Sequence, residues 1–286
     1  MKLVVIGGLT NGSILLDYFL KKKNISIELL VTHPLESKVP RYKKIKNSYL
    51  NKIKTIHDLD ANRYSNLINE IKPDLIFVIG WSGMIGKQII DAPKIGCIGF
   101  HPSKLPLNRG RSVLAWQIED GTKYTAYTAF FMTKLPDAGD IIVQQNFRID
   151  SDDYIEDILD KVDFSLKKML PKINTMINKK KFIRIKQNLK KGSYRKIRND
   201  NNSLIDWSRD ALYTYNKIRA ISKPYPGAFY KIGKSKILVW KSKILNFKVK
   251  PENKSGDLLK VYKNGNKIFM TNDKPILIYS NDEKRK

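Results

Sequence analysis

Apolar runs alternate with segments of helical spacing along the first two thirds of the chain. The runs expected as strands are 3–8, 28–32, 74–80, 95–100, 124–132 and 141–149. Between them, apolar side chains recur at helical spacing at Ile14, Leu15, Tyr18 and Phe19, and at Leu67, Ile68 and Ile71. Continuous apolar strands that alternate with helices are typical of a parallel sheet covered on both faces. The pattern predicts the α/β class, with a Rossmann-like, mostly parallel sheet and helices on both faces.

Helices are also predicted at 112–118 and 154–178, and the polar, basic stretch 187–203 is predicted as a linker. Beyond this stretch the pattern changes. After a further helix at 208–221, about five short apolar runs follow, separated by Gly, Lys and Asn turns. Such spacing favours a small C-terminal β-barrel-like (OB-like) domain. We therefore expect a catalytic domain at 1–186, a linker at 187–203 and a β-rich domain at 204–286.

Composition adds constraints on location and partners. The 286 residues carry a net charge of +27, which suits either an anionic partner or a general bias toward lysine in residue usage. The single cysteine, Cys97, allows no intrachain disulfide. No apolar run approaches 18 residues, and the N-terminus reads as a strand and turn rather than a secretory signal. We expect a cytoplasmic protein with no membrane partner.

The first turn, Gly-Gly-Leu-Thr-Asn-Gly at 7–12, invites a dinucleotide-binding interpretation. It lacks the G-x-G-x-x-G spacing, and no acidic residue ends the next strand. The sequence therefore favours a glycine turn that packs a helix on the sheet. Amides at the start of that helix, near Thr10 and Asn11, could still meet an anionic ligand.

His101 follows a predicted parallel strand, at the sheet edge where open α/β folds bind ligands. Arg109 and Arg111 place two cations close by in sequence, suited to phosphate or carboxylate. Asp137 and Asp140 lie in a glycine-containing turn between two strands. A carboxylate beside His101 would suit proton transfer. The alternative is a capping histidine on a loop and aspartates that serve only as turn residues.

Taken together, these motifs resemble the folate-dependent formyltransferases. His-Pro-Ser-Lys-Leu-Pro stands at 101–106, and Leu-Pro-Asp-Ala-Gly-Asp at 135–140, with His101 and Asp137 separated by 36 residues as in that family. The segment 205–229 is similar to the opening of the C-terminal domain of methionyl-tRNA and nucleotide-sugar formyltransferases. The resemblance covers most of the chain.

The resemblance implies a catalytic pair and two binding regions, with 10-formyltetrahydrofolate as formyl donor, a primary amine as acceptor and no metal. His101 would hold the developing oxyanion and shuttle a proton, with Asp137 stabilising the imidazolium. The expected cofactor-binding residues are Trp81, Ser82, Gly83, Met84, Ile85, Leu135 and Asp140. The expected substrate-binding residues are Thr10, Asn11, Asn108, Arg109, Gly110, Arg111 and Lys223.

One position departs from the family. The asparagine expected two residues before the histidine is Gly99 here. Loss of an oxyanion donor typically costs about 3 kcal/mol in the barrier. Three alternatives follow. A water or another side chain, with Asn108 and Asn11 as candidates, replaces the missing donor. Otherwise His101 stabilises the oxyanion alone, or the activity is weakened or altered.

The acceptor amine has two main candidates within the family. Lys-Pro-Tyr-Pro-Gly-Ala at 223–228 and Asn-Arg-Gly-Arg at 108–111 resemble nucleotide-sugar N-formyltransferases more than the tRNA enzymes. We therefore expect a nucleotide diphosphate amino sugar of the amino-dideoxyhexose type as substrate, for lipopolysaccharide or O-antigen synthesis, and a homodimer. The alternatives are a methionyl-tRNA formyltransferase, the one case with a nucleic-acid partner, and a non-catalytic folate or nucleotide-sugar binding module.

Overall fold

The computed structural model describes residues 1–37, 39 and 52–280. Contacts divide the chain into two compact units. The first comprises Met1–Gly110, Thr125–Phe147 and Lys161–Tyr194, and the second Arg111–Tyr124, Arg148–Asp160 and Arg195–Lys286. Because this grouping follows contacts and not chain order, the linear boundaries at 186 and 204 stay a prediction.

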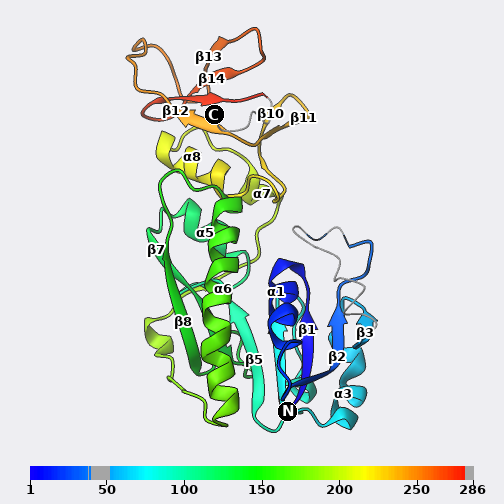
Figure 1. The fold of residues 1–286 in the computed structure, drawn as a ribbon. Coiled ribbons are helices and arrows are strands. Elements are labelled where there is room, and N and C mark those ends of the chain that lie inside the picture. The colour runs from blue at the N-terminus through cyan, green and yellow to red at the C-terminus, as the bar shows by residue number, and fades with distance from the viewer. Residues whose placement is uncertain (38, 40–51, 281–286) are drawn as a thin grey trace. The chain divides into compact units, whose positions relative to one another are not determined.

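The first unit is built on a seven-stranded sheet with the order β3-β2-β1-β4-β5-β7-β8 (Figure 1). Its strands are β1 (Lys2–Gly7), β2 (Ser26–Thr32), β3 (Lys54–His57), β4 (Leu75–Ile79), β5 (Gly96–His101), β7 (Tyr124–Phe131) and β8 (Ile141–Arg148). The first five are parallel, and β7 runs antiparallel to β5. The predicted mostly parallel sheet is thus confirmed.

Both faces of this sheet are covered, because the apolar strands place successive side chains on opposite sides. Val4 and Ile6 of β1 join one core cluster with Ile68 of α3 and Ile89 of α4. On the other face, Phe77 of β4 stacks on Phe19 of α1 at 5.2 Å between ring centroids. The helical segments in this part of the chain are α1 (Leu9–Phe19), η1 (Ala61–Tyr64), α3 (Ser65–Ile71), α4 (Lys87–Ile90), α6 (Ile155–Asn178) and η2 (Leu189–Lys191).

The glycine turn at 7–12 is explained by close packing. A Cβ on Gly7 would lie 2.1 Å from the Ile79 carbonyl oxygen, so no other residue fits where β1 meets β4. Gly8 precedes α1 and offers no side-chain cap. The Asn11 side chain donates to Asp163 Oδ1 of α6 within the first unit. These contacts favour the packing role that the sequence predicts for the turn.

The second unit contains a small β domain, as predicted. Its strands form a four-stranded antiparallel sheet, β12-β15-β14-β13, and a separate hairpin, β10-β11. Their bounds are β10 (Ala228–Ile232), β11 (Ser235–Val239), β12 (Ser242–Ile244), β13 (Leu258–Val261), β14 (Lys267–Met270) and β15 (Pro275–Ile278). The helices of this unit are α5 (Val113–Glu119), α7 (Asp200–Ser203) and α8 (Ala211–Ala220). Two further strands of two residues each are β6 (Arg109–Gly110), in the first unit, and β9 (Tyr194–Arg195), at the boundary of the units along the chain.

A buried ion cluster ties α5 to α8 within the second unit. Glu119 is 4% exposed, and its carboxylate lies 2.5 Å from Arg198 Nη1 and 3.0 Å from Lys217 Nζ. Tyr213 donates its hydroxyl to Glu119 at 2.6 Å. Burial alone would raise the pKa of Glu119, but the Tyr213 hydrogen bond and the two cations lower it overall. Since Arg198 belongs to the predicted linker, that stretch is not a solvated spacer throughout.

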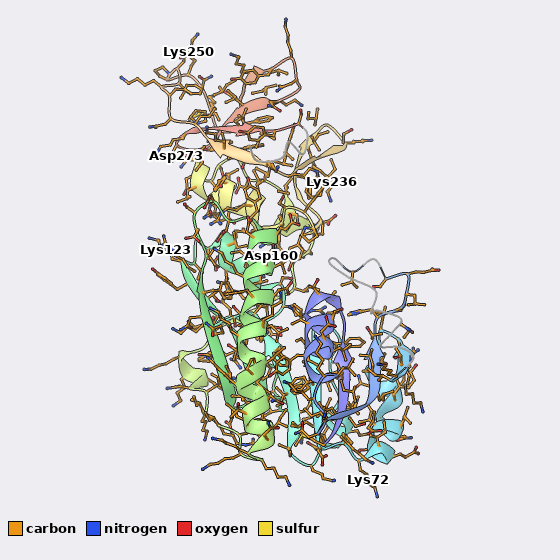
Figure 2. The ribbon with its side chains drawn as sticks, viewed as in Figure 1. Lys72, Lys123, Asp160, Lys236, Lys250 and Asp273 are labelled. Carbon is orange, nitrogen blue, oxygen red and sulfur yellow. The ribbon has the colours of Figure 1, made fainter. Side chains whose placement is uncertain are left out.

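Many of the lysines lie on the outside of their units. Lys72, Lys123, Lys236 and Lys250 are exposed and are labelled in Figure 2. None of the helices among the described residues has the length and apolar character needed to cross a membrane.

Candidate active site

His101 is the last residue of β5 and is 7% exposed. Its Nε2 lies 2.8 Å from the Asn108 carbonyl oxygen. A carbonyl only accepts hydrogen bonds, so Nε2 carries a proton and Nδ1 is the nitrogen that gains or loses one.

Asp137 faces that second nitrogen. Its Oδ1 lies 3.7 Å from His101 Nδ1, and its Oδ2 accepts a hydrogen bond of 2.8 Å from the Gly110 amide. The 3.7 Å gap is longer than a hydrogen bond, and a carboxylate only accepts hydrogen bonds, so Asp137 donates nothing to the Nδ1 lone pair. The structure therefore brings together the predicted His101 and Asp137, with the carboxylate placed to stabilise an imidazolium.

The loop that follows His101 is held by several polar contacts. Thr128 donates its hydroxyl to the Ser103 carbonyl at 2.6 Å, and Ser103 in turn donates to the Leu107 carbonyl at 2.7 Å. At the far end of the loop, the Asn108 amide donates to Ser193 Oγ at 2.8 Å. The Asn108 carbonyl, which orients the His101 ring, is thus held by the hydrogen bond to the Leu107 carbonyl before it and by the hydrogen bond from its own backbone N–H to Ser193. A site that is already ordered in this way costs less free energy to organise during the reaction.

Gly99 lies where no side chain can start without a shift of its neighbours. A Cβ there would be 2.9 Å from Phe130 Cζ and 3.0 Å from Met132 Cγ. Apolar side chains therefore fill the space in which the family's asparagine would begin. Asn11, one suggested substitute donor, is engaged with Asp163. For Asn108, the other suggested substitute, the contact with His101 is made by the backbone carbonyl, which accepts a hydrogen bond and donates none.

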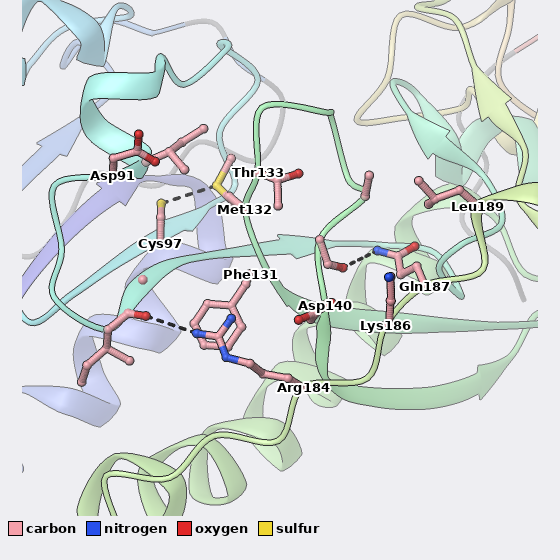
Figure 3. A pocket seen from close by; sticks show the side chains of 15 residues that line it. Asp91, Cys97, Phe131, Met132, Thr133, Asp140, Arg184, Lys186, Gln187 and Leu189 are labelled. Carbon is pink, nitrogen blue, oxygen red and sulfur yellow. Dashed lines mark hydrogen bonds between the residues drawn. The ribbon is translucent and has the colours of Figure 1, made fainter.

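A cavity of about 320 Å³ lies next to the Asp137 turn (Figure 3). Its wall includes Cys97, Met132, Gly139 and Asp140, with Cys97 Sγ 3.6 Å from Met132 Sδ. Burial raises the pKa of the Cys97 thiol far above its usual range, so the thiol stays neutral. The wall thus combines an apolar surface with carboxylates, and Figure 3 shows Arg184 beside the Phe131 ring at its edge.

The remaining predicted cofactor residues lie outside this wall. Asp140 lines the cavity, whereas Leu135 and residues 81–85 do not. Trp81 packs on His33 at 5.0 Å, Ile85 is buried in the core, and Met84 is 70% exposed. The role of this loop in binding the cofactor stays a prediction.

The predicted substrate residues are divided between the two units. Thr10, Asn11, Asn108, Arg109 and Gly110 belong to the first, and Arg111 and Lys223 to the second. Arg109 Nε and Thr10 Oγ1 are buried and have no hydrogen-bond partner among the described residues. Lys223 Nζ lies 5.2 Å from the Trp240 ring centroid. Their substrate roles stay predictions.

Two side-chain amides that the sequence analysis did not select support the candidate loops. Asn62 accepts from the Gly86 amide at 2.7 Å and donates to the Met84 carbonyl at 2.9 Å. Gln187 donates to the carbonyls of Asp137 and Gly139. Both lie in polar stretches without a motif, and no sequence signal marks them.

No group of three or more His, Cys, Asp or Glu side chains placed to hold a metal occurs in residues 1–37, 39 and 52–280. The expected absence of a metal stays a prediction.

A mostly parallel α/β sheet with a histidine and an aspartate brought together at the carboxyl end of a strand is typical of a small-molecule enzyme site. Residues 1–173 match the family model "Formyl transferase", and residues 196–286 match "Formyl transferase, C-terminal domain". The chain belongs to the formyl transferase family, and the resemblance noted in the sequence is confirmed.

Curated relatives carry two kinds of name. Over 201 residues the chain is 35% identical to the bifunctional polymyxin resistance protein ArnA of Wigglesworthia glossinidia brevipalpis, covering 70% of this chain and 31% of that protein. Over 196 residues it is 32% identical to the methionyl-tRNA formyltransferase of Ruminiclostridium cellulolyticum, covering 68% of this chain and 62% of that protein. The aligned part thus spans less than two thirds of either relative.

Solved structures share the fold over nearly the whole chain. WlaRD, a sugar 3N-formyl transferase crystallised in the presence of dTDP and 5-N-formyl-THF, aligns with a TM-score of 0.73 at 20% identity, covering 99% of both chains. The N-formyltransferase of Helicobacter canadensis, in complex with folinic acid and dTDP-3-aminofucose, aligns at 0.71 and 21% identity, covering 98% of both. At such identities the similarity establishes the fold.

Proposed function

We propose that this chain moves a formyl group from 10-formyltetrahydrofolate to the primary amine of an amino sugar carried by a nucleoside diphosphate. The observation that carries the proposal is the His101–Asp137 pair at the carboxyl end of β5. The names of WlaRD and of the Helicobacter canadensis enzyme support the choice of acceptor. The proposal extends to a role in surface polysaccharide synthesis, a cytoplasmic location and a homodimer.

The chemistry follows from the charges that the site can hold. The amine would form a bond to the formyl carbon of the donor, and the bond from that carbon to the folate nitrogen would break. His101 Nδ1 would take the proton that the amine loses and return it to the released folate nitrogen. The Asp137 carboxylate, 3.7 Å away, would stabilise the imidazolium between these two proton transfers. The Nε2–H bond to Asn108 keeps the ring in one tautomer throughout. The Gly110 backbone N–H donates to Asp137 Oδ2 at 2.8 Å and so orients the carboxylate with its other oxygen toward His101.

The cavity beside residues 138–140 is lined from the start of β5, at Gly96 and Cys97, and by neither His101 nor Asp137, so we infer a binding role for it that is separate from the transfer step. Its volume lies in the range of small-molecule sites, and Cys97 and Met132 give it an apolar surface. The Asp140 carboxylate on its wall is an acceptor for amino or ring N–H groups. These residues would hold a flat, partly apolar ring by its faces and by one polar edge.

Methionyl-tRNA formylation is the second candidate. It is favoured by the curated relative at 32% identity and by the net charge of +27, which suits a polyanionic acceptor. A binding module without catalysis is the third, because Gly99 has no donor side chain.

The test is turnover with individual acceptors. The chain is mixed with 10-formyltetrahydrofolate and, separately, with amino nucleotide-sugars or methionyl-tRNA, and absorbance of the tetrahydrofolate product is followed. We expect turnover with at least one amino sugar and a loss of at least about a hundredfold in His101→Asn. Turnover with methionyl-tRNA alone would favour the second candidate, and no turnover with any acceptor the third.

A further inference from the structure

Gln187 lies between two anchored points of the chain in the first unit. Two residues before it, Ile185 exchanges backbone hydrogen bonds of 2.8 and 2.9 Å with Ile141. Two residues after it, η2 begins at Leu189. The side chain is 7% exposed and lines the cavity (Figure 3). Its place beside the aspartate turn is therefore determined by the backbone on both sides.

The Gln187 amide nitrogen contacts both ends of the Asp137 turn. Nε2 donates to the Asp137 carbonyl at 2.9 Å and to the Gly139 carbonyl at 2.7 Å. The reverse amide orientation would place Oε1 against two carbonyl oxygens, so only this orientation makes hydrogen bonds. Oε1 itself is buried and has no partner among the described residues. A buried, unpaired amide oxygen costs about 1–3 kcal/mol, which an apolar side chain of similar size would avoid.

The turn that Gln187 holds is conformationally unfavourable by itself. Asp137 has φ +53°, a left-handed conformation that costs a non-glycine residue about 1 kcal/mol or more. A Cβ on Gly139 would lie 1.7 Å from the Phe131 carbonyl oxygen, so the turn lies directly on β7. Without an outside donor, the Asp137 carbonyl would be free to rotate toward a relaxed conformation.

We propose that Gln187 is a positioning residue for formyl transfer. It fixes the backbone of Asp137 so that the carboxylate reaches both the Gly110 amide and His101 Nδ1. The expected effect of Gln187 on turnover rests on the proposed function, whereas its expected effect on the conformation of the Asp137 turn does not. In the part of the chain that the structure describes, Gln187 hydrogen-bonds neither His101 nor the Asp137 carboxylate, and it acts through the main chain of the turn, at the carbonyls of Asp137 and Gly139.

Gln187→Met removes both donors at similar volume, and Gln117→Met is the matched control. Gln117 is also buried and also donates its amide to a carbonyl, that of Val113, but within α5. Exchange of the Gly110 amide hydrogen, followed by NMR in the full chain, reports the Asp137 contact without any substrate. We expect exchange at least about tenfold faster in Gln187→Met and nearly unchanged in Gln117→Met. Unchanged exchange in Gln187→Met would overturn the proposal.

Kinetics supply the second readout. We expect Gln187→Met to lower kcat about a hundredfold, with KM for either substrate changed less than about threefold. Added to Asp137→Asn, it should lower kcat little further, because both changes disable the same group. Additive losses would contradict the proposal.

Gln187→Glu gives a pH-dependent rescue. A protonated carboxyl group restores one donor, whereas the carboxylate repels both carbonyls. Activity relative to the unsubstituted chain should therefore rise as the pH falls, and a constant ratio would count against the assignment. If the unsubstituted chain formylates no acceptor, the proposed function fails, and exchange at Gly110 still decides whether Gln187 holds the turn.

Discussion

Replacement of Gly99 by alanine tests whether the side chains of Phe130 and Met132 occupy the space of the missing asparagine. The new Cβ would lie 2.9 Å from Phe130 Cζ, 3.0 Å from Met132 Cγ and 3.1 Å from Phe130 Cε1. Ordinary contacts begin near 3.4 Å, so the neighbours must move by several tenths of an ångström. Phe130 is 2% exposed and has little room to do so. Overpacking of this kind costs about 1–3 kcal/mol in the free energy of unfolding.

The assay is denaturant unfolding of four chains: unsubstituted, Gly99→Ala, Phe130→Leu and the double variant. Phe130→Leu shortens the side chain that meets the new Cβ, so Gly99→Ala should cost less in its presence. We expect a coupling of about 1 kcal/mol or more between the two changes. Gly12→Ala is the control, because a Cβ there meets nothing closer than 3.5 Å. It should be neutral or stabilising by up to about 1 kcal/mol.

Two results would refute this reasoning. One is a cost for Gly99→Ala below about 0.5 kcal/mol, and the other is a cost that is the same with Phe130 or Leu at position 130. For activity, Gly99→Asn alone should not raise kcat, since its side chain enters occupied space. A large rise in kcat at unchanged KM would show that a missing oxyanion donor limits the reaction.

Three further predictions concern other parts of the chain. Asp137→Asn should lower kcat at least about a hundredfold in the formyl-transfer assay, and activity near that of the unsubstituted chain would contradict the assigned pairing. Glu119→Gln should reduce the free energy of unfolding by about 3 kcal/mol at pH 7. The pKa of Glu119 is lower in the folded chain than the ordinary value of 4.5, so ionised Glu119 stabilises the fold fully above that value. The stabilisation is lost as the pH falls through the pKa of the folded chain. The urea midpoints of the unsubstituted chain and of Glu119→Gln should therefore converge in acid. Asn62→Ala should raise the KM for the formyl donor about tenfold with little change in kcat if the loop at 84–86 binds the cofactor; a fall in kcat alone would argue against that role.

The parallel strands β1, β2, β4 and β5 were predictable because each one contains a continuous apolar run. β4 and β5 lie in the interior of the sheet, where both faces are covered, and their sequences show it. The edge strand β3, with the sequence Lys-Thr-Ile-His, was not among the predicted strands, since its four residues carry no apolar run. The helix α4 was also not predicted, because its four residues are too few to show a helical period.

The chemistry at the site was predictable where a motif carries it, and not where a contact does. His101 and Asp137 were selected from their motifs, and the fold brings them to 3.7 Å. The filling of the space at Gly99 depends on the register of β5 against β7, in which Gly99 pairs with Phe130. No local pattern specifies that register across more than 30 residues. Gln187 was invisible because one amide in a polar stretch has no periodicity or spacing to mark it.

The central claim is formyl transfer to an amino nucleotide-sugar, and a competition between acceptors tests it most directly. The chain receives 10-formyltetrahydrofolate with equal concentrations of a dTDP-linked amino sugar panel and methionyl-tRNA, and mass spectrometry measures which amine gains a formyl group. The account predicts formylation of an amino sugar at a rate at least about a hundredfold above that of the tRNA, and its loss in His101→Asn. Preferential formylation of methionyl-tRNA, or equal transfer by the His101→Asn chain, would contradict it.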